Sequence, residues 1–557
     1  MPDEWRWPRG DGLADAPVLA EVRSALWLDG RPEEFPLVAG KVQNLRVALP
    51  AFHAVEVPAG GVLSFWRQLG RPTARRGFVL GREVRQGCVV PTLAGGICQL
   101  SNALATAAHR AGLEMVERHG HTASIEDATA PELDATVFWR HVDLRLRAPW
   151  PWRVEISMDA DELVLTIRGS VPAAKPAAIP IRREAPSSPA ARGCLSCGET
   201  TCFRHGTHGA AATTRGRTLA LLDAWVPEFE AWLDVEVERF VPVPTRLAFW
   251  RARPPAWAGH RFYAVSLLHV FRLGASARLG NGRRQASIVQ GQRRLAQAYA
   301  RSLRPEHVRL LVDQGLLPRL ELLGALAGRE VVVLATSLPM AEIETRLDAA
   351  AKRWPDEASL RDYRAPPDIV AAEARALARA ECVVTPHGEV AQVLGARGVR
   401  VERLDWQRPA TRRAPAGDAC AEPRVVFAAS SLARKGAREM AAALAGMPSC
   451  RVRIVGNVQG WRGRLPEPWQ GDPLADASVV ALPAHVEHAP RLLLRALALG
   501  LPVVATPACG LPKQPGLRLV PPGDVEALRE ALIDALNAAR KHAELEAYIA
   551  AERNAWD

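Results

Sequence analysis

Two stretches near the C-terminus decide the fold of this chain of 557 residues. Residues 424–440 read RVVFAASSLARKGAREM, and residues 478–511 read SVVALPAHVEHAPRLLLRALALGLPVVATPACGL. Each begins with a short β-branched run, passes through a turn and continues into a helical pattern rich in Ala, Leu and Arg. A third stretch, LVPPGDVEALREAL, adds a strand end and a helix capped by Asp524. These stretches predict successive strand–turn–helix units.

The same alternation extends back to Thr218. Strand-like runs such as VVVLAT, CVVTP and VRIVG alternate with helical stretches from there onward. This rhythm is typical of βα units in a parallel, doubly wound sheet, which binds its ligands outside the carboxyl ends of the strands. The polar segment from Gln407 to Glu422 interrupts the pattern. We therefore predict two Rossmann-like halves joined by a hinge.

Length and composition bound the rest of the chain. At about 150 residues per domain this length predicts three to four domains, and a composition of 48% hydrophobic and 24% charged residues is typical of folded proteins. The Pro/Ala/Ser-rich run from Ser170 to Gly193 is typical of a linker. We predict an α/β multidomain protein with an α+β domain at 1–169, a linker at 170–193, a Cys/His-rich module at 194–217, Rossmann-like halves at 218–406 and 423–557, and a hinge at 407–422.

Charge and targeting features point to no membrane or nucleic-acid partner. The net charge of +11 comes almost entirely from scattered arginines, which a GC-rich genome produces without any function attached. Met1–Arg9 carries Asp3 and Glu4 and is followed by no apolar run, and the long uncharged run Gly87–Ala108 is broken by Pro, Gly and Gln. We expect a cytoplasmic protein with no transmembrane segment and unpaired cysteines.

The densest chemistry of the N-terminal domain lies in GGICQLSNALATAAHRAGLEMVERHGHTASI, residues 95–125. Cys98 would begin a helix, where the macrodipole and free N–H groups favour a thiolate. A strand over Glu114–Ile125 would place His119 and His121 on one face, and either could act as general base. Asp134 or Asp143 would orient the imidazole. This order of Cys, His and acid resembles that of transglutaminase-like and papain-like enzymes, which implies acyl transfer or amide hydrolysis.

Two other interpretations of the same residues stay open. Cys98 could be a small buried residue of a domain that binds a ligand or is purely structural. Alternatively, Cys88, Cys98, His119 and His121 could bind a metal, although their spacing is not that of a metal motif.

Three motifs of this domain, GGICQLSNAL, ERHGHT and LDATVFWRHVDLRLR, together resemble the VanW family over about Phe35–Arg147. The family pattern falls here on Cys98, Gln99, Ser101, His119, His121 and Asp134. The resemblance identifies a domain without implying a reaction.

A short cysteine cluster follows the linker. RGCLSCGETTCFRHGTH places Cys194, Cys197 and Cys202 with C-x2-C-x4-C spacing, followed by His205 and His208. Three thiolates and one histidine would complete a tetrahedral zinc site, and the metal would supply the folding energy of so short a segment. An iron–sulfur cluster or a loop without metal are the alternatives.

Residues 424–537 resemble the donor-binding domain of the retaining GT-B glycosyltransferases, and Thr218–Trp406 would be the acceptor half. The resemblance implies that Lys435 and Gly436 contact a donor diphosphate, in keeping with N–H groups at a helix start. Glu487 matches the first of two glutamates that contact the donor, whereas Arg495 stands at the second position. Ser430 and Ser431 replace a usual arginine. His387 would face the cleft as a base or hydrogen-bonding group, or be a satisfied turn histidine.

We therefore expect a glycosyltransferase that uses a nucleotide-diphosphate sugar and a glycan or envelope-precursor acceptor in cell-envelope or surface-glycan metabolism. The alternatives are a Cys98-dependent amidase or acyltransferase with a non-catalytic GT-B-like scaffold, and a non-enzymatic envelope-assembly adaptor. The departures at Arg495, Ser430 and Ser431 leave open whether the second half is active.

Overall fold

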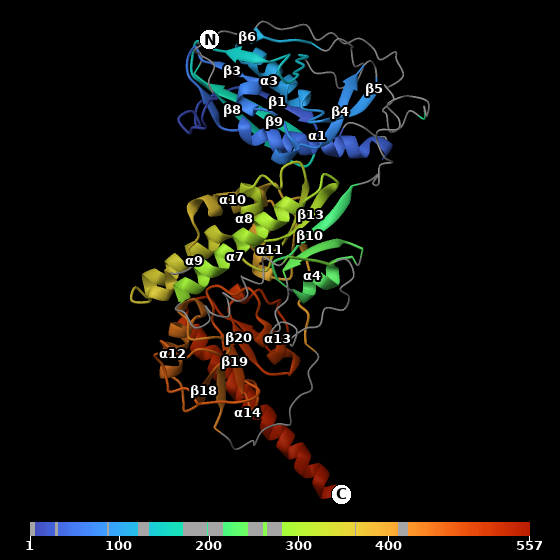
Figure 1. Ribbon diagram of the computed structural model, residues 1–557. Coiled ribbons are helices and arrows are strands. Elements are labelled where there is room, and N and C mark those ends of the chain that lie inside the picture. The colour runs from blue at the N-terminus through green and yellow to red at the C-terminus, as the bar shows by residue number, and fades with distance from the viewer. Residues whose placement is uncertain are drawn as a thin grey trace. The chain divides into compact units, whose positions relative to one another are not determined.

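A computed structural model describes the protein over the following residues: 6–27, 32–85, 88–120, 133–170, 198, 216–224, 226–234, 236–242, 260–263, 281–361, 364–409 and 422–556 (Figure 1). The chain divides into two compact units. One comprises Met1–Leu219, Ala300–Leu310 and Leu320–Val331, and the other comprises Ala220–Tyr299, Leu311–Arg319 and Val332–Asp557. Below, "N-terminal domain" means the described residues up to 170, "first half" those within 216–409, and "second half" those within 422–556.

The N-terminal domain is built on an antiparallel sheet. Its strands, in spatial order, are β1 (Val18–Ala25), β9 (Glu162–Gly169), β8 (Trp152–Met158) and β2 (Val55–Val57). Alternate side chains of β8, namely Trp152, Val154, Ile156 and Met158, are buried, as expected for a strand with one face in the core. The helices are α1 (Phe35–Ala48), α2 (Phe65–Leu69) and α3 (Cys98–Arg110).

Two smaller sheets complete this domain. One has the order β3 (Val62–Ser64), β7 (Arg145–Arg147) and β6 (Glu114–Glu117), and the other is the hairpin β4 (Leu80–Arg85) and β5 (Cys88–Leu93). Helix α3 begins at Cys98 and buries Leu100, Leu104, Ala107 and Ala108, the apolar positions expected from the sequence. The expected strand over Glu114–Ile125 is shorter: β6 has a register irregularity between Met115 and Glu117 and ends there.

The first half contains a seven-stranded sheet. In spatial order its strands are β12 (His260–Tyr263), β11 (Glu238–Pro242), β10 (Arg217–Leu221), β13 (His307–Asp313), β14 (Glu330–Leu334), β15 (Cys382–Thr385) and β16 (Val401–Arg403). The pairs β11/β12, β14/β15 and β15/β16 are parallel. Its helices are α4 (Pro227–Trp232), α7 (Asn281–Ser302), α8 (Leu317–Leu322), α9 (Met340–Arg353), α10 (Pro367–Ala378) and α11 (Gly388–Ala396).

The second half is a smaller parallel sheet with helices. Its strands, in spatial order, are β18 (Arg451–Ile454), β17 (Arg424–Phe427), β19 (Val479–Leu482), β20 (Val503–Ala505) and β21 (Leu517–Leu519), and all neighbours are parallel. Val425, Val426 and Phe427 are fully buried, because a parallel sheet is covered on both faces. Its helices are α12 (Ala437–Ala445), α13 (Arg491–Ala498) and α14 (Val525–Trp556).

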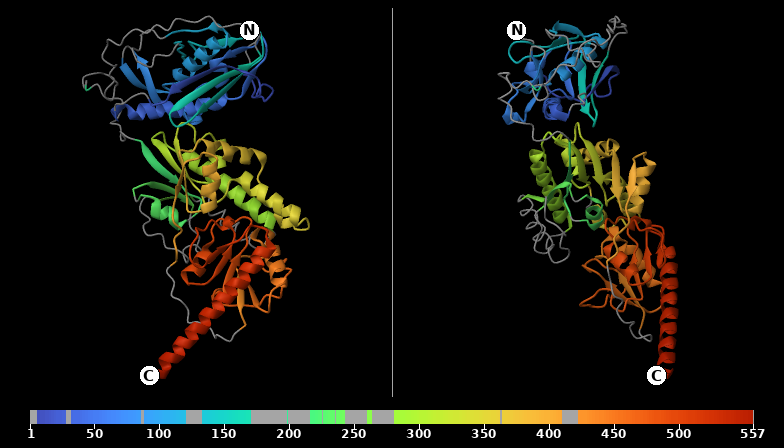
Figure 2. Two further views of the ribbon diagram at one scale, coloured as in Figure 1. Left: turned by 180° about the vertical axis from the view of Figure 1, so that it is seen from behind. Right: turned by 90° about the vertical axis from the view of Figure 1, so that its right-hand side faces the viewer.

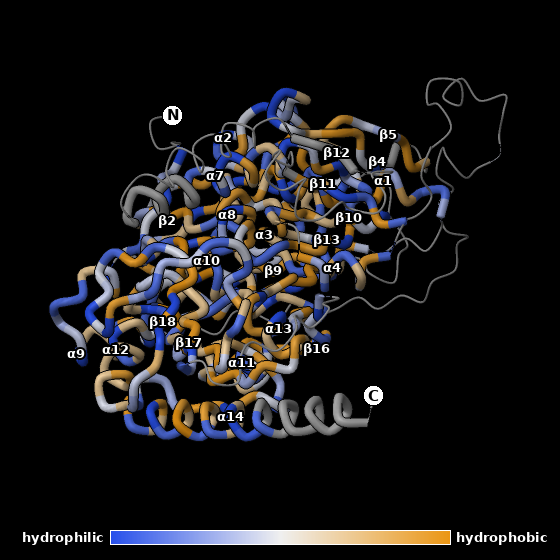
Figure 3. The backbone as a smooth tube through the Cα atoms, turned by 90° about the horizontal axis from the view of Figure 1, so that it is seen from below, coloured by the Kyte–Doolittle hydropathy of each residue, from blue (hydrophilic) through white to orange (hydrophobic). Residues whose placement is uncertain are grey.

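Helix α14 ends the chain. The Asp524 carboxylate accepts a hydrogen bond from the Ala527 N–H at 3.0 Å, which is the cap expected from the sequence. Leu528, Ala531 and Leu532 are buried against the second sheet, while the last turns extend away from that sheet (Figure 2). Hydrophobic and hydrophilic residues alternate along the coloured part of the helix in Figure 3, in keeping with an apolar face at helical spacing.

The predicted fold class is confirmed by these sheets: two Rossmann-like halves follow an antiparallel α+β domain. The predicted ligands of the Cys/His module, Cys194, Cys197, Cys202 and His205, lie outside the described residues, as do residues 171–193 of the expected linker. Among the residues that the structure describes, no helix has both the length and the apolarity needed to cross a bilayer.

Candidate functional site

The strand order of the second half creates a binding position at the ends of β17 and β19. β18 lies on one side of β17 and the later strands lie on the other, so the order of connection reverses between β17 and β19. At such a reversal the chain leaves neighbouring strands toward opposite faces of the sheet, and a crevice opens at their carboxyl ends. The segments that follow these strands are residues 428–436, after β17, and residues 483–490, after β19.

Lys435 and Glu487 meet at these strand ends. The Lys435 Nζ lies 2.9 Å from Glu487 Oε2 and donates a second hydrogen bond to the Val486 carbonyl at 2.9 Å. The other carboxylate oxygen of Glu487 accepts hydrogen bonds from the N–H groups of His488 at 2.9 Å and Ala489 at 3.0 Å. Each of the two charged side chains keeps 13% of its surface exposed. Both predicted donor-binding residues are therefore held in one ordered cluster.

The charges of this cluster are fixed by its surroundings. Burial acts to raise the pKa of Glu487, but the charge and hydrogen bond of Lys435, together with the N–H of Ala489, lower the pKa to about 2. Burial, followed by the charge of Lys435, lowers the pKa of His488 to about 4. At neutral pH Glu487 is thus an anion and His488 is a neutral ring.

Gly436 lets the two segments approach closely. Its φ is +79°, and a Cβ at this position would lie 2.0 Å from the Pro483 carbonyl oxygen. Any side chain would both strain the backbone and push the segment after β17 away from the segment after β19. The glycine of the Lys-Gly pair is therefore required by geometry, and Gly436 leads directly into α12.

The serines that replace the expected arginine stabilise a neighbouring loop. Between Ile454 and Val479, all of which the structure describes, the chain forms neither helix nor strand. The Ser430 hydroxyl accepts a hydrogen bond from the Asn457 N–H at 3.1 Å, and the Ser431 hydroxyl donates one to the Gln459 carbonyl at 2.7 Å. Ser430 and Ser431 thus fasten the 455–478 loop to the turn after β17.

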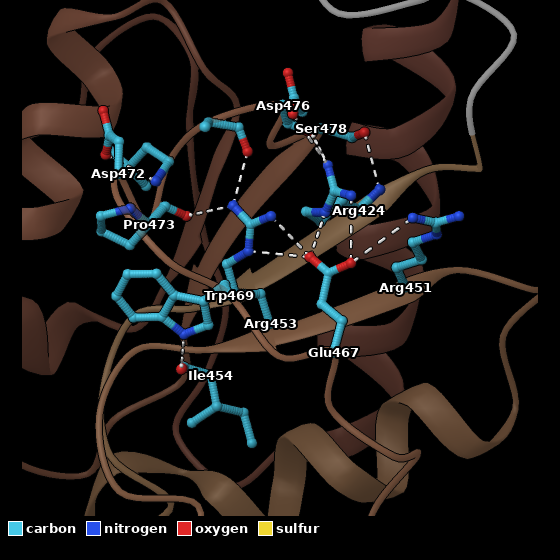
Figure 4. Close-up of polar contacts among 12 residues, drawn as sticks. Arg424, Arg451, Arg453, Ile454, Glu467, Trp469, Asp472, Pro473, Asp476 and Ser478 are labelled. Carbon is cyan, nitrogen blue, oxygen red and sulfur yellow. Dashed lines mark hydrogen bonds and ion pairs between the residues drawn. The ribbon is translucent and has the colours of Figure 1, made fainter.

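A carboxylate at the far side of the same loop binds several arginines (Figure 4). Glu467 accepts a hydrogen bond from Arg453 Nε at 3.0 Å, forms an ion pair with Arg453 Nη2 at 2.8 Å, and accepts hydrogen bonds from Arg424. Burial acts to raise the pKa of Glu467, but the hydrogen bonds and charges of Arg424 and Arg453 outweigh it and lower the pKa. Arg424 and Arg453 lie on β17 and β18, so the ion pairs anchor the loop directly on the sheet.

Arg495 interacts with this loop as well. Its guanidinium lies 2.5 Å from the Asp472 carboxylate. The Arg495 side chain is 36% exposed and the Asp472 side chain is 40% exposed. Arg495 stands on α13, one turn beyond Arg491. The described contacts thus place Arg495 against the 455–478 loop, and its expected contact with a donor stays a prediction.

In the N-terminal domain, Cys98 lies beside Thr136 and Val137. Its Sγ is 3.8 Å from Thr136 Oγ1 and 3.8 Å from the Val137 carbonyl, and the residue is half-buried. The His119 backbone pairs with Thr136, but its ring contacts Glu117, with Nε2 3.2 Å from Oε1. The described contacts of Cys98 therefore include no imidazole.

The remaining predicted members of this site are placed as follows. The Asp134 backbone carbonyl accepts a hydrogen bond from Arg118 at 2.7 Å. Asp143 accepts hydrogen bonds from the Ser64 hydroxyl at 2.6 Å and the Trp66 N–H at 3.1 Å, so its described role is to hold the start of α2. His121 lies outside the described residues.

The polar residues of the GGICQLSN motif bind backbone groups. Gln99 donates to the Ala25 carbonyl at 2.7 Å, Ser101 donates to the Ala135 carbonyl at 2.5 Å, and the Asn102 side chain accepts from the Ala135 N–H at 2.7 Å. Gly96 has φ +87° and a Cβ there would lie 2.2 Å from the Lys41 side chain. Much of the motif therefore fixes the start of α3 against its neighbours.

The described residues contain no group of three or more His, Cys, Asp or Glu side chains arranged to hold a metal ion. Cys88 and Cys98 lie on β5 and α3, respectively. The predicted zinc or iron–sulfur ligands fall outside the described residues, so that prediction is not tested.

Several residues near the crevice have no sequence signal of their own. Glu439, on α12, accepts hydrogen bonds from Trp354 Nε1 at 2.8 Å and pairs with His485 Nε2 at 3.0 Å. Arg491 forms two hydrogen bonds of 2.6 Å with the buried Glu228 of the first half. These partners are 46 to 263 residues apart in sequence, and only the fold brings them together.

Comparison with known families agrees with this architecture. Residues 40–169 match the family described as "VanW like protein", and residues 422–538 match the family described as "Glycosyl transferases group 1". The chain therefore contains a VanW domain and a glycosyltransferase group 1 domain, which confirms both predicted resemblances.

Two curated relatives match part of the chain. YoaR of Bacillus subtilis is 31% identical over 129 residues, which cover 23% of this chain and 42% of the relative. The vancomycin B-type resistance protein VanW of Enterococcus faecalis is 25% identical over 153 residues, which cover 26% of this chain and 56% of the relative. The chain thus spans about half the length of the curated relatives that it matches.

Solved structures are also similar to part of the chain. Sucrose-phosphate synthase from Thermosynechococcus elongatus is 17% identical and covers 59% of this chain and 94% of its own, with a TM-score of 0.38. Anabaena Alr3699/HepE in complex with UDP-glucose is 14% identical and covers 59% of this chain and 91% of its own, with a TM-score of 0.36.

Proposed function

Starting from a VanW domain joined to a glycosyltransferase group 1 domain, we propose that the two Rossmann-like halves transfer a sugar from a nucleoside-diphosphate donor. The acceptor would be a glycan or an envelope precursor, in cell-envelope or surface-glycan metabolism. The reaction would retain the anomeric configuration of the donor, as implied by the GT-B class that residues 424–537 resemble. The VanW domain would recognise or modify the same substrate.

The observation that carries this proposal is the Lys435–Glu487 pair at the reversal of strand order. A cation there, at the positive end of the α12 dipole, suits a diphosphate. Glu487 has a pKa of about 2, so it is a hydrogen-bond acceptor at neutral pH and suits the hydroxyl groups of a sugar. The Lys435 ammonium donates to Glu487 and to the Val486 carbonyl, and the third of its three N–H groups would bind the diphosphate while Glu487 holds the ammonium in place.

A screen of the full chain against nucleotide sugars tests the proposal. UDP-, GDP- and ADP-linked sugars are added singly, and both the thermal unfolding midpoint and the hydrolysis of the donor are followed. We expect at least one nucleotide sugar to stabilise the wild type by mass action, and Lys435→Ala to abolish that stabilisation. The control is Lys513→Ala, which removes an exposed lysine of the same half.

Two results would contradict the proposal. One is the absence of both stabilisation and donor hydrolysis with every nucleotide sugar. The other is a Lys435→Ala variant that binds the nucleotide as tightly as the wild type and the Lys513→Ala control. The nucleotide that binds best would also identify the base of the donor.

A further inference from the structure

Residues of the first half contact both segments that form the Lys435–Glu487 site. Trp354 of the first half donates a hydrogen bond to Glu439, which stands one turn after Lys435, and His387 contacts the main chain of Glu487. The Glu439–His485 contact then links the two segments to each other, because His485 lies two residues before Glu487. Groups of the first half therefore determine how the site is assembled.

His387 makes the most direct of these contacts. The residue is fully buried at the start of α11. Its Nδ1 accepts a hydrogen bond from the Val390 N–H at 3.3 Å, so the proton of the neutral ring is on Nε2. That Nε2–H donates to the Glu487 carbonyl at 3.0 Å. Nδ1 of the ring thus caps helix α11 of the first half, while Nε2 binds the main chain of the second half.

The surroundings of the ring leave it little freedom. Gly510, with φ +64°, packs against it so closely that a Cβ would lie 2.3 Å from His387 Nδ1. The Gly510 carbonyl accepts hydrogen bonds from the Gly388 N–H at 2.8 Å and from Trp406 Nε1 at 3.1 Å. Burial lowers the pKa of His387, in agreement with a neutral ring.

We propose that His387 is a positioning residue for Glu487: by binding its carbonyl from the first half, His387 keeps the Glu487 carboxylate directed at Lys435. The main-chain N–H groups of His488 and Ala489 that bind this carboxylate follow directly after the held carbonyl. Loss of the His387 contact frees this turn, and the carboxylate then loses its fixed direction. The inference rests on the proposed function only where it uses nucleotide affinity as a measure of this site.

Two substitutions each remove or weaken one of the two hydrogen bonds of the His387 ring and keep the other. In His387→Asn the side-chain carbonyl takes the place of Nδ1 and keeps the helix cap, but the side chain is too short to reach Glu487. In His387→Gln the amide nitrogen reaches the place of Nε2 and keeps the contact with Glu487, while the cap is weakened. Gly510→Ala displaces the ring without changing His387 itself.

The full-length variants are examined by two measurements. The first is hydrogen exchange of peptides covering residues 483–490, without any nucleotide. The second is titration with UDP, GDP and ADP. For His387→Asn and Gly510→Ala we expect faster exchange in this segment and about tenfold weaker nucleotide binding, as the loss of one hydrogen bond predicts. For His387→Gln we expect wild-type exchange in the segment, near wild-type affinity and a lower unfolding midpoint.

The outcomes distinguish this inference from the proposed function. If His387→Asn leaves exchange in residues 483–490 unchanged, the inference is overturned, whether or not a nucleotide binds. If the wild type binds no nucleotide but exchange rises in His387→Asn, the proposed function fails and the positioning role stands. If His387→Asn and His387→Gln lose nucleotide affinity equally and speed exchange in residues 483–490 equally, His387 is only a structural cap. That result would also overturn the inference.

Discussion

Replacement of Glu487 by glutamine should destabilise the second half in a manner that depends on pH. The ordinary pKa of a glutamate is 4.5, and the pKa of Glu487 in the folded protein is about 2, a difference of about 2.5. Because one pKa unit corresponds to 1.36 kcal/mol, ionised Glu487 stabilises the fold by about 3 kcal/mol at neutral pH, as an order of magnitude. Glutamine keeps the shape of the side chain but leaves the Lys435 ammonium without an anion.

The direction of the pH dependence follows from the lowered pKa. A group whose pKa falls on folding contributes its full stability above its unfolded pKa, here 4.5, and loses it as the pH falls toward about 2. Glu487→Gln should therefore be less stable than the wild type by about 3 kcal/mol at pH 7, and the gap should narrow below pH 4.5. At about 2–4 °C per kcal/mol, the unfolding midpoint of the second half should fall by about 6–12 °C at pH 7.

Calorimetry gives the midpoints, and hydrogen exchange of peptides from residues 479–498 assigns the change to this site. The control is Glu526→Gln, which removes a carboxylate of the same half that is 73% exposed and pairs with Arg529 on α14. That variant should unfold near the wild-type temperature, because exposed ion pairs contribute little. A Glu487→Gln variant that matches the wild type at pH 7, or whose deficit does not change with pH, would refute the reasoning.

Three further predictions concern other residues. Gly436→Ala should lower stability by about 1–3 kcal/mol in chemical denaturation and abolish nucleotide binding, because a Cβ would meet the Pro483 carbonyl; full binding by this variant would contradict the geometry. Arg495→Ala should change stability by less than about 1 kcal/mol and leave nucleotide affinity unchanged, because the side chain contacts Asp472; weaker binding measured by titration would instead assign Arg495 to the donor. Iodoacetamide should label the half-buried Cys98 long before Cys509, because Cys509 is fully buried and burial raises its pKa to about 12. Mass spectrometry of the native protein gives the order of labelling. If Cys98→Ala also keeps every activity of the protein, the nucleophile hypothesis fails.

The sequence determines the local elements of this protein. Runs such as RVVF and SVVAL are buried strands of a parallel sheet, and Asp524 caps the helix that it precedes. These features can be predicted from the sequence because residues that are close in the chain produce them. β-Branched runs form strands, and a capping side chain accepts a hydrogen bond from the N–H three residues ahead. Lys435 and Gly436 stand in a short motif at the start of a helix, whereas the role of Glu487 is implied by the resemblance to the GT-B donor domain.

Only the tertiary structure decides what those residues contact. Arg495 pairs with Asp472, Asp143 holds the start of α2, and His387 binds a carbonyl 100 residues away. In each case the sequence shows a polar residue of suitable chemistry but not its partner, because the partner lies on a different element. Hydrogen bonds and ion pairs act over about 3 Å, so the strand order and the turns that bring two segments to that distance decide which of the possible contacts form.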